Sequence, residues 1–450
     1  MARIYTTAGG RFLEEARVAF SAAVRHPGLP AVEIFPGRQF QPLLGFGIAL
    51  TGASCHLLGR MEKSARRALL TDVFGPGGLG LSLARISVGA SDYDCEAYTC
   101  DDTPDDWDLR DFSIEQDQKL TLPAVREAKE INPGLFVFSS VWSPPAWMKT
   151  GGQLYGGWLR EDCLEVYARY YVRFLEAWRA EGVEISALTP QNESETDQCG
   201  RMPACYLHPQ HELRLVRDYL RPLLRKAGLP AKIWLLDHNY ILWNRPRWQL
   251  GQPGVLEATD GVAFHYYEGT SDMAAKLLEE FPALELHWTE GGPNLGAGYE
   301  DDWCYWGRIF TEALEAGCRS VTGWNLLLDE TGGPNLGPFS CAGLLTIDSQ
   351  TGALTKSGQY RAFAHFGRFF QRGSVRMETR SHGGLYDHSG RDTSLYHTAF
   401  CNPDGTLAAM LTNPGARQDV ELCIGGGAAR MILPENSLTT IVLDKEEACL

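Results

Sequence analysis

Between residues 43 and 370, short apolar runs alternate with longer amphipathic stretches. The short runs are rich in β-branched and aromatic residues, whereas the longer stretches repeat their apolar positions with the period of an α-helix. The predicted strands are 44–50, 83–88, 135–141, 185–190, 232–236, 261–267, 284–289 and 320–326, with predicted helices between them such as 164–178 and 212–224. Repeated strand and helix units of this kind predict an α/β fold, the (β/α)8 TIM barrel.

The periodicity changes after the last predicted helix, 359–370. Short predicted strands follow at 393–400, 407–411, 420–424 and 438–443, and the run Asn402-Pro-Asp-Gly405 is typical of a turn. Residues 31–35 also form a strand-like run. We therefore expect an N-terminal segment over 1–42, a barrel over 43–370, and an all-β domain over 371–450 that pairs with the N-terminal segment.

The charge balance excludes partners that need a basic surface. The 450 residues hold 41 Lys and Arg against 56 Asp and Glu, a net charge of −15, and no cluster of basic residues stands out. Nucleic acids and anionic membranes both require concentrated positive charge, so neither is an expected partner. A chain that is 44% hydrophobic and 22% charged is typical of a globular protein, which argues against disorder.

No stretch of the sequence predicts a membrane span. The longest run without charged residues, 39–58, contains Gln, Pro, Gly, Ser and His residues that a bilayer core does not tolerate. Residues 1–15 lack the apolar segment of a secretory signal, so we expect a cytoplasmic protein, although a form with its signal removed would look the same. The twelve Cys residues form no CxxC pair, which suits reduced thiols.

One local cluster allows a metal-binding interpretation. Cys199, Cys205, His208 and His211 are close enough in sequence for a tetrahedral zinc site, and such a site would favour a zinc hydrolase. Their spacing, C-x5-C-x2-H-x2-H, matches no standard zinc finger. A loop running into a helix explains the same residues, so we expect no metal and no other cofactor.

The candidate chemistry lies where the predicted barrel strands end, since reacting groups of such barrels occupy that edge. The polar and aromatic residues at these ends are Asp92, Trp142, Asn192, Glu193, His265, Tyr267, Glu290 and Trp324. Glu193 and Glu290 close the fourth and seventh predicted strands, among aromatic residues. Aromatic burial raises the pKa of one carboxyl while hydrogen bonds keep another ionised, which supplies the acid and the nucleophile of glycosidic bond cleavage.

Either glutamate alone could equally be a surface or ion-paired residue. A different class of protein, a carbohydrate-binding barrel without activity, would be favoured if one of the two carboxylates were missing. Both carboxylates are present in this sequence.

Several motifs occur in order along most of the chain. They are Gly45-Phe-Gly47, Val88-Gly-Ala-Ser-Asp92, Asp101-Asp-Thr-Pro-Asp-Asp106, Trp142-Ser-Pro-Pro-Ala-Trp147, Asn192-Glu193, His265-Tyr-Tyr267, Glu290 and Trp324-Asn-Leu326. Together they resemble glycoside hydrolase family 30, the glucosylceramidase type of retaining β-glycosidase. The two strand-end glutamates are shared by many retaining glycosidases, whereas the Asp-Asp-Thr-Pro and Trp-Ser-Pro runs narrow the resemblance to this family.

The resemblance implies a barrel flanked by a β-sandwich built from both chain ends, and a double displacement with retention. Glu193 would be the general acid/base and Glu290 the nucleophile, with their carboxyl groups about 5 to 5.5 Å apart. Asn192 would bind the sugar 2-hydroxyl, and Asp92 the hydroxyls farthest from the scissile bond. Tyr267 would hold the nucleophile.

The remaining candidates would support this site. Trp142 and Trp324 would form its walls and floor. His265 would bind substrate or order the neighbouring polar network, although a buried core histidine is an equal alternative. Arg85, inside a predicted strand, would pair with a carboxylate of the site, because an unpaired buried charge is costly.

The sequence also departs from the family pattern. Ser194 follows Glu193 where the family usually has Pro, and Glu195 places a second carboxylate beside the acid. We expect an exo-acting β-glucosidase or glucosylceramidase-like enzyme that takes a small-molecule or glycolipid β-glycoside. Xylose and fucose stay open as the preferred sugar, whereas Asp92 would repel glucuronic acid. The sequence does not indicate an oligomeric state.

Overall fold

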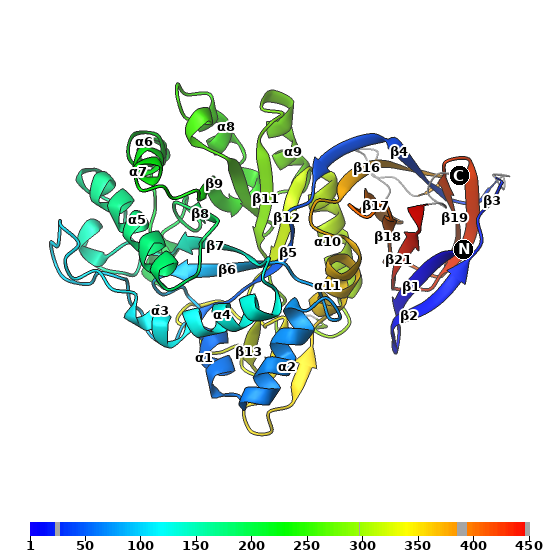
Figure 1. Ribbon diagram of the computed structural model, residues 1–450, viewed down its shortest axis with the longest axis horizontal. Helices are drawn as coiled ribbons and strands as arrows, with labels where there is room; N and C mark the ends of the chain where they lie inside the picture. Colours follow the sequence, from blue (N-terminus) through cyan, green and yellow to red (C-terminus); the bar gives the residue numbers. More distant parts are fainter. Residues whose placement is uncertain (23–27, 297, 385–393, 446–450) are drawn as a thin grey trace.

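The larger part of the molecule is a closed eight-stranded barrel (Figure 1). The computed structural model describes residues 1–22, 28–296, 298–384 and 394–445. The barrel strands are β5 (Gly45–Ala49), β6 (Leu83–Val88), β7 (Phe136–Val141), β8 (Ala187–Thr189), β9 (Lys232–Asn239), β10 (Gly261–His265), β11 (Glu285–Glu290) and β12 (Cys318–Gly323). All are parallel, and β12 pairs with β5 to close the ring. The predicted (β/α)8 fold is confirmed.

Helices surround the barrel on its outer face (Figure 1). They are α1 (Gly52–Arg60), α2 (Lys63–Phe74), α3 (Glu115–Lys119), α4 (Thr121–Ile131), α5 (Leu164–Ala180), α6 (Pro209–Arg214), α7 (Arg221–Lys226), α8 (Asn244–Leu250), α9 (Ser271–Glu280), α10 (Trp303–Glu315) and α11 (Gly358–Phe369). The predicted helix 212–224 lies within the continuous helical run from α6 to α7. Helix α11 begins at Gly358 because the Ser357 hydroxyl accepts the Tyr360 N–H at 3.0 Å.

The β-domain is built from both ends of the chain. Its ten strands are β1 (Ala2–Ala8), β2 (Arg11–Val18), β3 (Ser21–Ala22), β4 (Ala31–Pro42), β16 (Val375–His382), β17 (Tyr396–Cys401), β18 (Leu407–Asn413), β19 (Gln418–Ile424), β20 (Gly427–Leu433) and β21 (Ser437–Leu443). Strand β1 pairs with β21, and β4 lies between β16 and β19, so the two termini share one sheet (Figure 1). The strands are hydrogen-bonded in one continuous order around their own hydrophobic core.

Helices α10 and α11 join the two parts. Both pack against β-domain strands, and α10 buries Trp303, Trp306 and Phe310. His365 of α11 is fully buried and its two ring nitrogens lie 2.8 Å from the hydroxyls of Thr7 and Thr440. These contacts link a barrel helix to strands from both ends of the chain.

Some elements differ from the sequence prediction. A small sheet of β13 (Leu327–Asp329), β14 (Leu345–Ile347) and β15 (Leu354–Lys356) was not predicted, because its strands are too short to show a period. The predicted strand 393–400 begins at a residue outside those described, and β17 begins at Tyr396. Among the described residues, no helix combines the length and the apolar character that crossing a membrane requires.

Candidate active site

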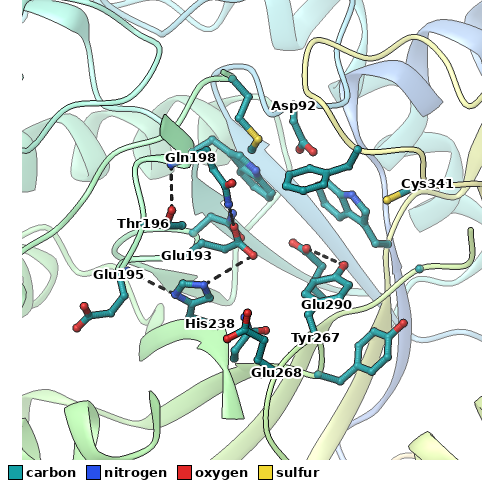
Figure 2. Close-up of a pocket in the computed structure, with 18 of the residues that line it drawn as sticks. Asp92, Glu193, Glu195, Thr196, Gln198, His238, Tyr267, Glu268, Glu290 and Cys341 are labelled. Atoms are coloured by element: carbon teal, nitrogen blue, oxygen red, sulfur yellow. Dashed lines mark hydrogen bonds and ion pairs between the residues drawn. The ribbon is translucent and has the colours of Figure 1, made fainter. Parts of the chain in front are cut away.

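The predicted site residues gather at the carboxyl ends of the barrel strands. They surround a cavity of about 630 Å³ whose lining includes Asp92, Trp142, Asn192, Glu193, Tyr267, Glu290 and Trp324. Arg85 and His265 are fully buried and lie beneath this lining. Figure 2 shows Glu193 and Glu290 between Asp92 at one end of the cavity and Glu195 and Glu268 at the other.

Two irregularities in the barrel strands set the positions of the acidic groups. In β9, Leu236 pairs with Ala263 of β10 and His238 pairs with Phe264 of β10. Asp237 is therefore an extra residue in β9, and its φ is 48°. In β11, Trp288 pairs with Phe264 of β10 and Glu290 pairs with His265, which leaves Thr289 as the extra residue. β-Bulges commonly redirect side chains beside active sites, and here they bring Asp237 and Glu290 next to His265.

Glu290 is held by two donors. The Arg85 guanidinium donates to Glu290 Oε2 at 2.5 Å, and the Tyr267 hydroxyl donates to Oε1 at 3.0 Å. Only 8% of the Glu290 side chain is exposed. These two contacts hold the carboxylate in a fixed position facing the cavity, as a nucleophile requires.

Glu193 lies on the opposite side of the cavity and has different partners. Its Oε2 accepts a hydrogen bond from the Gln198 side-chain amide at 2.6 Å, and its Oε1 lies 3.5 Å from His265 Nδ1. Ligand atoms of Glu193, His265 and Glu290 all lie within 4.8 Å of one another. Carboxylates this close fit a retaining glycosidase, whereas an inverting enzyme separates them by about 6.5–9.5 Å to hold a water.

Asp237 is the centre of the buried polar network, and sequence reasoning missed it. Its Oδ2 accepts from Arg85, Ser140 and Thr189 at 2.6–2.8 Å, and its Oδ1 lies 3.1 Å from His265 Nε2. Burial opposes the ionised form, but these partners lower the pKa of Asp237 well below its usual range. The predicted strand ended at Leu236, and the polar triplet that follows it was the available signal.

His265 supports the carboxylates and does not line the cavity. Burial alone would lower its pKa, but the charges of Glu290 and Asp237 and the contacts with Asp237 and Glu193 raise it to about 9. Burial alone would raise the pKa of Glu193, but His265, His238 and Gln198 together lower it to about 2. The imidazole therefore holds the proton in the resting site. The prediction that His265 binds substrate is corrected, because the side chain is fully buried among carboxylates.

His238 is a second histidine beside Glu193. Its Nδ1 accepts the backbone N–H of Glu195 at 3.4 Å, which places the ring proton on Nε2. That Nε2 lies 3.9 Å from Glu193 Oε1. Burial lowers the pKa of His238 to about 4, so the ring is neutral at neutral pH.

These two histidines should differ in charge at pH 7. A group is protonated below its pKa, so His265 is expected as the imidazolium and His238 as the neutral ring with its proton on Nε2. Side-chain ¹⁵N NMR, with the signals assigned through His265→Asn and His238→Asn variants, measures both states directly. A neutral His265 at pH 7 would contradict the proton placement described above.

The end of the cavity that holds Asp92 has the aromatic and polar groups to bind a sugar ring. Trp142 and Trp324 stack with their ring centroids 5.1 Å apart, and the Arg85 guanidinium lies 4.8 Å and 5.4 Å from the two centroids. Asp92 is 5% exposed, and its Oδ1 has no hydrogen-bond partner among the described residues. Burial and the charges of Glu290 and Glu193 raise the pKa of Asp92. Unpaired buried polar atoms of this kind bind ligand hydroxyl groups.

Asn192 lines the cavity, and hydrogen bonds hold both its side chain and its backbone in place. Its Oδ1 accepts from Arg85 at 2.8 Å, and its backbone N–H donates to Val141 at 2.7 Å. Because the amide oxygen is occupied, the amide nitrogen is the group left to meet a sugar hydroxyl.

The residues that depart from the family pattern pack into the protein. The Ser194 hydroxyl donates to the Leu236 carbonyl at 3.0 Å. The Glu195 carboxylate accepts from Arg245 at 2.8 Å and from the Tyr206 hydroxyl at 3.0 Å, and Figure 2 shows it pointing away from Glu193. Glu195 is therefore ion-paired at the leaving-group end of the cavity.

The metal-binding interpretation of the neighbouring loop finds no support. Cys199 is exposed and Cys205 is buried, and burial raises the pKa of Cys205 to about 12. Cys199, Cys205, His208 and His211 do not bring three ligand atoms within metal-binding distance, although all four lie in the described part of the chain. His208 instead caps α6, where its Nδ1 accepts the N–H of Gln210 at 3.2 Å.

Comparison with known proteins identifies the family to which both parts of the chain belong. Residues 43–370 match the glycosyl hydrolase family 30 TIM-barrel domain. The chain belongs to glycosyl hydrolase family 30. Residues 373–441 match the β-sandwich domain of the same family. The resemblance found in the sequence motifs is thus confirmed, and the chain is a glycoside hydrolase.

Family 30 relatives of two named activities resemble this chain. An endo-1,6-beta-D-glucanase of Neurospora crassa is 29% identical over 88% of this chain and 85% of its own length. The lysosomal acid glucosylceramidase of Mus musculus is 28% identical, with 94% of this chain and 84% of that protein covered. Among solved structures, the endo-beta1,6-glucanase BT3312 superposes with a TM-score of 0.88 at 29% identity, covering 98% of this chain and 99% of that one.

Proposed function

We propose that this family 30 enzyme hydrolyses β-D-glucosides by double displacement through a covalent glycosyl-enzyme. The proposal depends on one observation: Glu193 and Glu290 bring carboxylate oxygens within 4.8 Å of each other while standing in different environments. Glu290 is held in place by Arg85 and Tyr267. Glu193 contacts a histidine that carries a proton.

In the first step, Glu290 attacks the anomeric carbon and the bond to the leaving oxygen breaks. Glu193 protonates that oxygen, using the proton that the resting site holds on His265, 3.5 Å away. In the second step, Glu193 removes a proton from water, which then attacks the anomeric carbon and releases Glu290, and the proton returns from Glu193 to His265. The two inversions together retain the β configuration.

Glucose as the sugar is supported by the relatives. The names of both relatives, an endo-1,6-beta-D-glucanase and a glucosylceramidase, specify a glucosyl bond. The stacked Trp142 and Trp324 offer an apolar wall to the ring, and Asp92 offers a buried oxygen to its distant hydroxyls.

The sugar preference is tested with aryl β-glycosides that differ only in the sugar. We expect the glucoside to exceed the xyloside and the fucoside by about tenfold or more in kcat/KM, because Asp92 loses hydroxyl partners with those sugars. Faster cleavage of the xyloside or fucoside would select those alternatives. No hydrolysis of any member would favour a carbohydrate-binding barrel without activity.

We propose exo action, because the end of the cavity near Asp92 is closed by the protein. The backbone N–H of Leu336 donates to the Asp92 carbonyl at 2.6 Å, and a Cβ at Gly337 would lie 2.9 Å from the Asp92 Cβ. Leu336 and Gly337 therefore pack directly against Asp92. Endo action is the second candidate, favoured by the endo-1,6-glucanases among the relatives.

Early products of β-1,6-glucan digestion distinguish the two modes. Exo action releases glucose as the only early sugar, because each cut removes a terminal residue. Endo action releases oligosaccharides of several lengths before glucose accumulates. Chromatography of samples taken at low conversion decides between them.

A further inference from the structure

A second groove lies beside the catalytic cavity. It has a volume of about 810 Å³, and its lining includes Trp158, Arg160, Glu161, Asp162 and Arg214. These residues come from the loop between β7 and α5, from the beginning of α5, and from the helical run that starts with α6. Crossover helices begin near the carboxyl ends of barrel strands, so the groove and the catalytic cavity open on the same face.

The groove presents a fixed aromatic surface. Trp158 is 47% exposed, and its ring centroid lies 4.0 Å from that of Tyr206. The backbone of Trp158 is held on both sides, since its N–H donates to the Thr150 hydroxyl at 2.9 Å and its carbonyl accepts the Thr150 N–H at 2.8 Å. The contact with Tyr206 and these two hydrogen bonds hold the half-exposed indole in place, where a sugar ring can stack on it.

Direct contacts connect this surface to the catalytic cavity. The hydroxyl of Tyr206, which stacks on Trp158, donates to Glu195 at 3.0 Å, and Glu195 lines the catalytic cavity. Arg245 anchors Glu195 from inside, through its own ion pair with the buried Glu212 at 2.8 Å. Trp158, Tyr206 and Glu195 thus link the groove to the leaving-group end of the cavity through direct contacts.

The charges of the groove suit a neutral, hydroxyl-rich ligand. Arg214 pairs with Glu161, and Arg160 pairs with Asp162, so the basic groups that line the groove are compensated. Glu165 and His211 add further polar groups. A lipid chain would need a continuous apolar surface, whereas Trp158 is the one exposed aromatic ring among the described lining residues.

We propose that Trp158 forms an outlying sugar-binding subsite, which holds the part of a β-glucan chain that extends beyond the leaving group. The sugar ring stacks its C–H face on the indole, and its hydroxyls meet the charged groups around it. This inference rests on the proposed function, and it makes a polysaccharide rather than a glycolipid the substrate that uses the whole surface.

The experiment compares a polymer with a small substrate. In Trp158→Ala, kcat/KM for β-1,6-glucan should fall by about tenfold, the effect of removing one aromatic contact of about 1.4 kcal/mol. The value for an aryl β-glucoside should stay within about twofold of the wild type, because that substrate does not reach the groove. Trp158→Phe should recover most of the activity on the polymer.

Trp248→Ala is the matched control. Trp248 lies on α8, is 42% exposed, and lines neither the cavity nor the groove, so its loss should affect neither substrate. An unchanged rate of Trp158→Ala on β-1,6-glucan, or an equal loss on both substrates, would overturn the subsite. A wild type that cleaves the aryl glucoside but not the glucan would also overturn it. A wild type that cleaves no glycoside would instead refute the proposed function.

Discussion

Replacing Glu290 with glycine should reduce hydrolysis of an aryl β-glucoside by more than about 10⁴-fold, because no other group can form the glycosyl-enzyme. Added azide should restore turnover. The small anion fits where the carboxylate was removed, attacks from the same side, and gives the α-glycosyl azide. Spectrophotometric rates with and without azide, and NMR of the azide product, measure both effects.

Glu193→Ala is the matched variant for the other carboxylate. It should retain the first step on a substrate with a good leaving group, and azide should then intercept the glycosyl-enzyme to give the β-glycosyl azide. The opposite anomers distinguish the nucleophile from the acid/base. Full activity of Glu290→Gly, or the same anomer from both variants, would refute the assignment.

Replacing Arg85 with leucine should damage both stability and activity. Arg85 is fully buried and contacts Glu290 at 2.5 Å and Asp237 and Asn192 at 2.8 Å. Its loss leaves two buried carboxylates without their guanidinium partner, which should lower the free energy of unfolding by about 3–5 kcal/mol. Misplacement of Glu290 should lower kcat/KM by about 10²-fold or more.

Denaturant unfolding and kinetics on the same preparations measure the two losses. Arg85→Lys should be intermediate, since it keeps the charge but cannot bridge the carboxylates with a planar guanidinium. Arg110→Leu removes the exposed ion pair with Asp108 and should change stability by less than about 0.5 kcal/mol. If Arg85→Leu were as stable and as active as the wild type, the network would not hold Glu290.

The barrel and most of the site can be predicted from the sequence, because the end of each barrel strand is recognisable as the point where an apolar run meets a polar residue. Apolar runs that close on Glu193, His265 or Glu290 identify both the strand and its candidate residue. Each of these residues lines the cavity or lies directly beneath it.

The groups that tune the site are harder to predict. Asp237 faces the network only because a bulge adds one residue to β9, and a bulge leaves no trace in the alternation of apolar positions. His238 follows on the same strand end, which the pattern closed at Leu236. Gln198 reaches Glu193 from a loop in which its φ is 52°, a conformation that composition does not predict.

The β-domain shows the same limit on a larger scale. Strand periodicity predicts its strands and suggests that residues 31–35 join them. The pairing of β4 with β16 on one side and β19 on the other joins residues far apart along the chain, and this order depends on tertiary contacts.

The central claim is that Glu290 forms a covalent bond with the sugar. Incubation with 2-deoxy-2-fluoro-β-D-glucosyl fluoride slows the second step, so the glycosyl-enzyme should accumulate, and mass spectrometry of a protein digest should find the fluorosugar on the peptide that carries Glu290. A label on a different carboxylate, or turnover of the reagent without any labelled protein, would contradict this account.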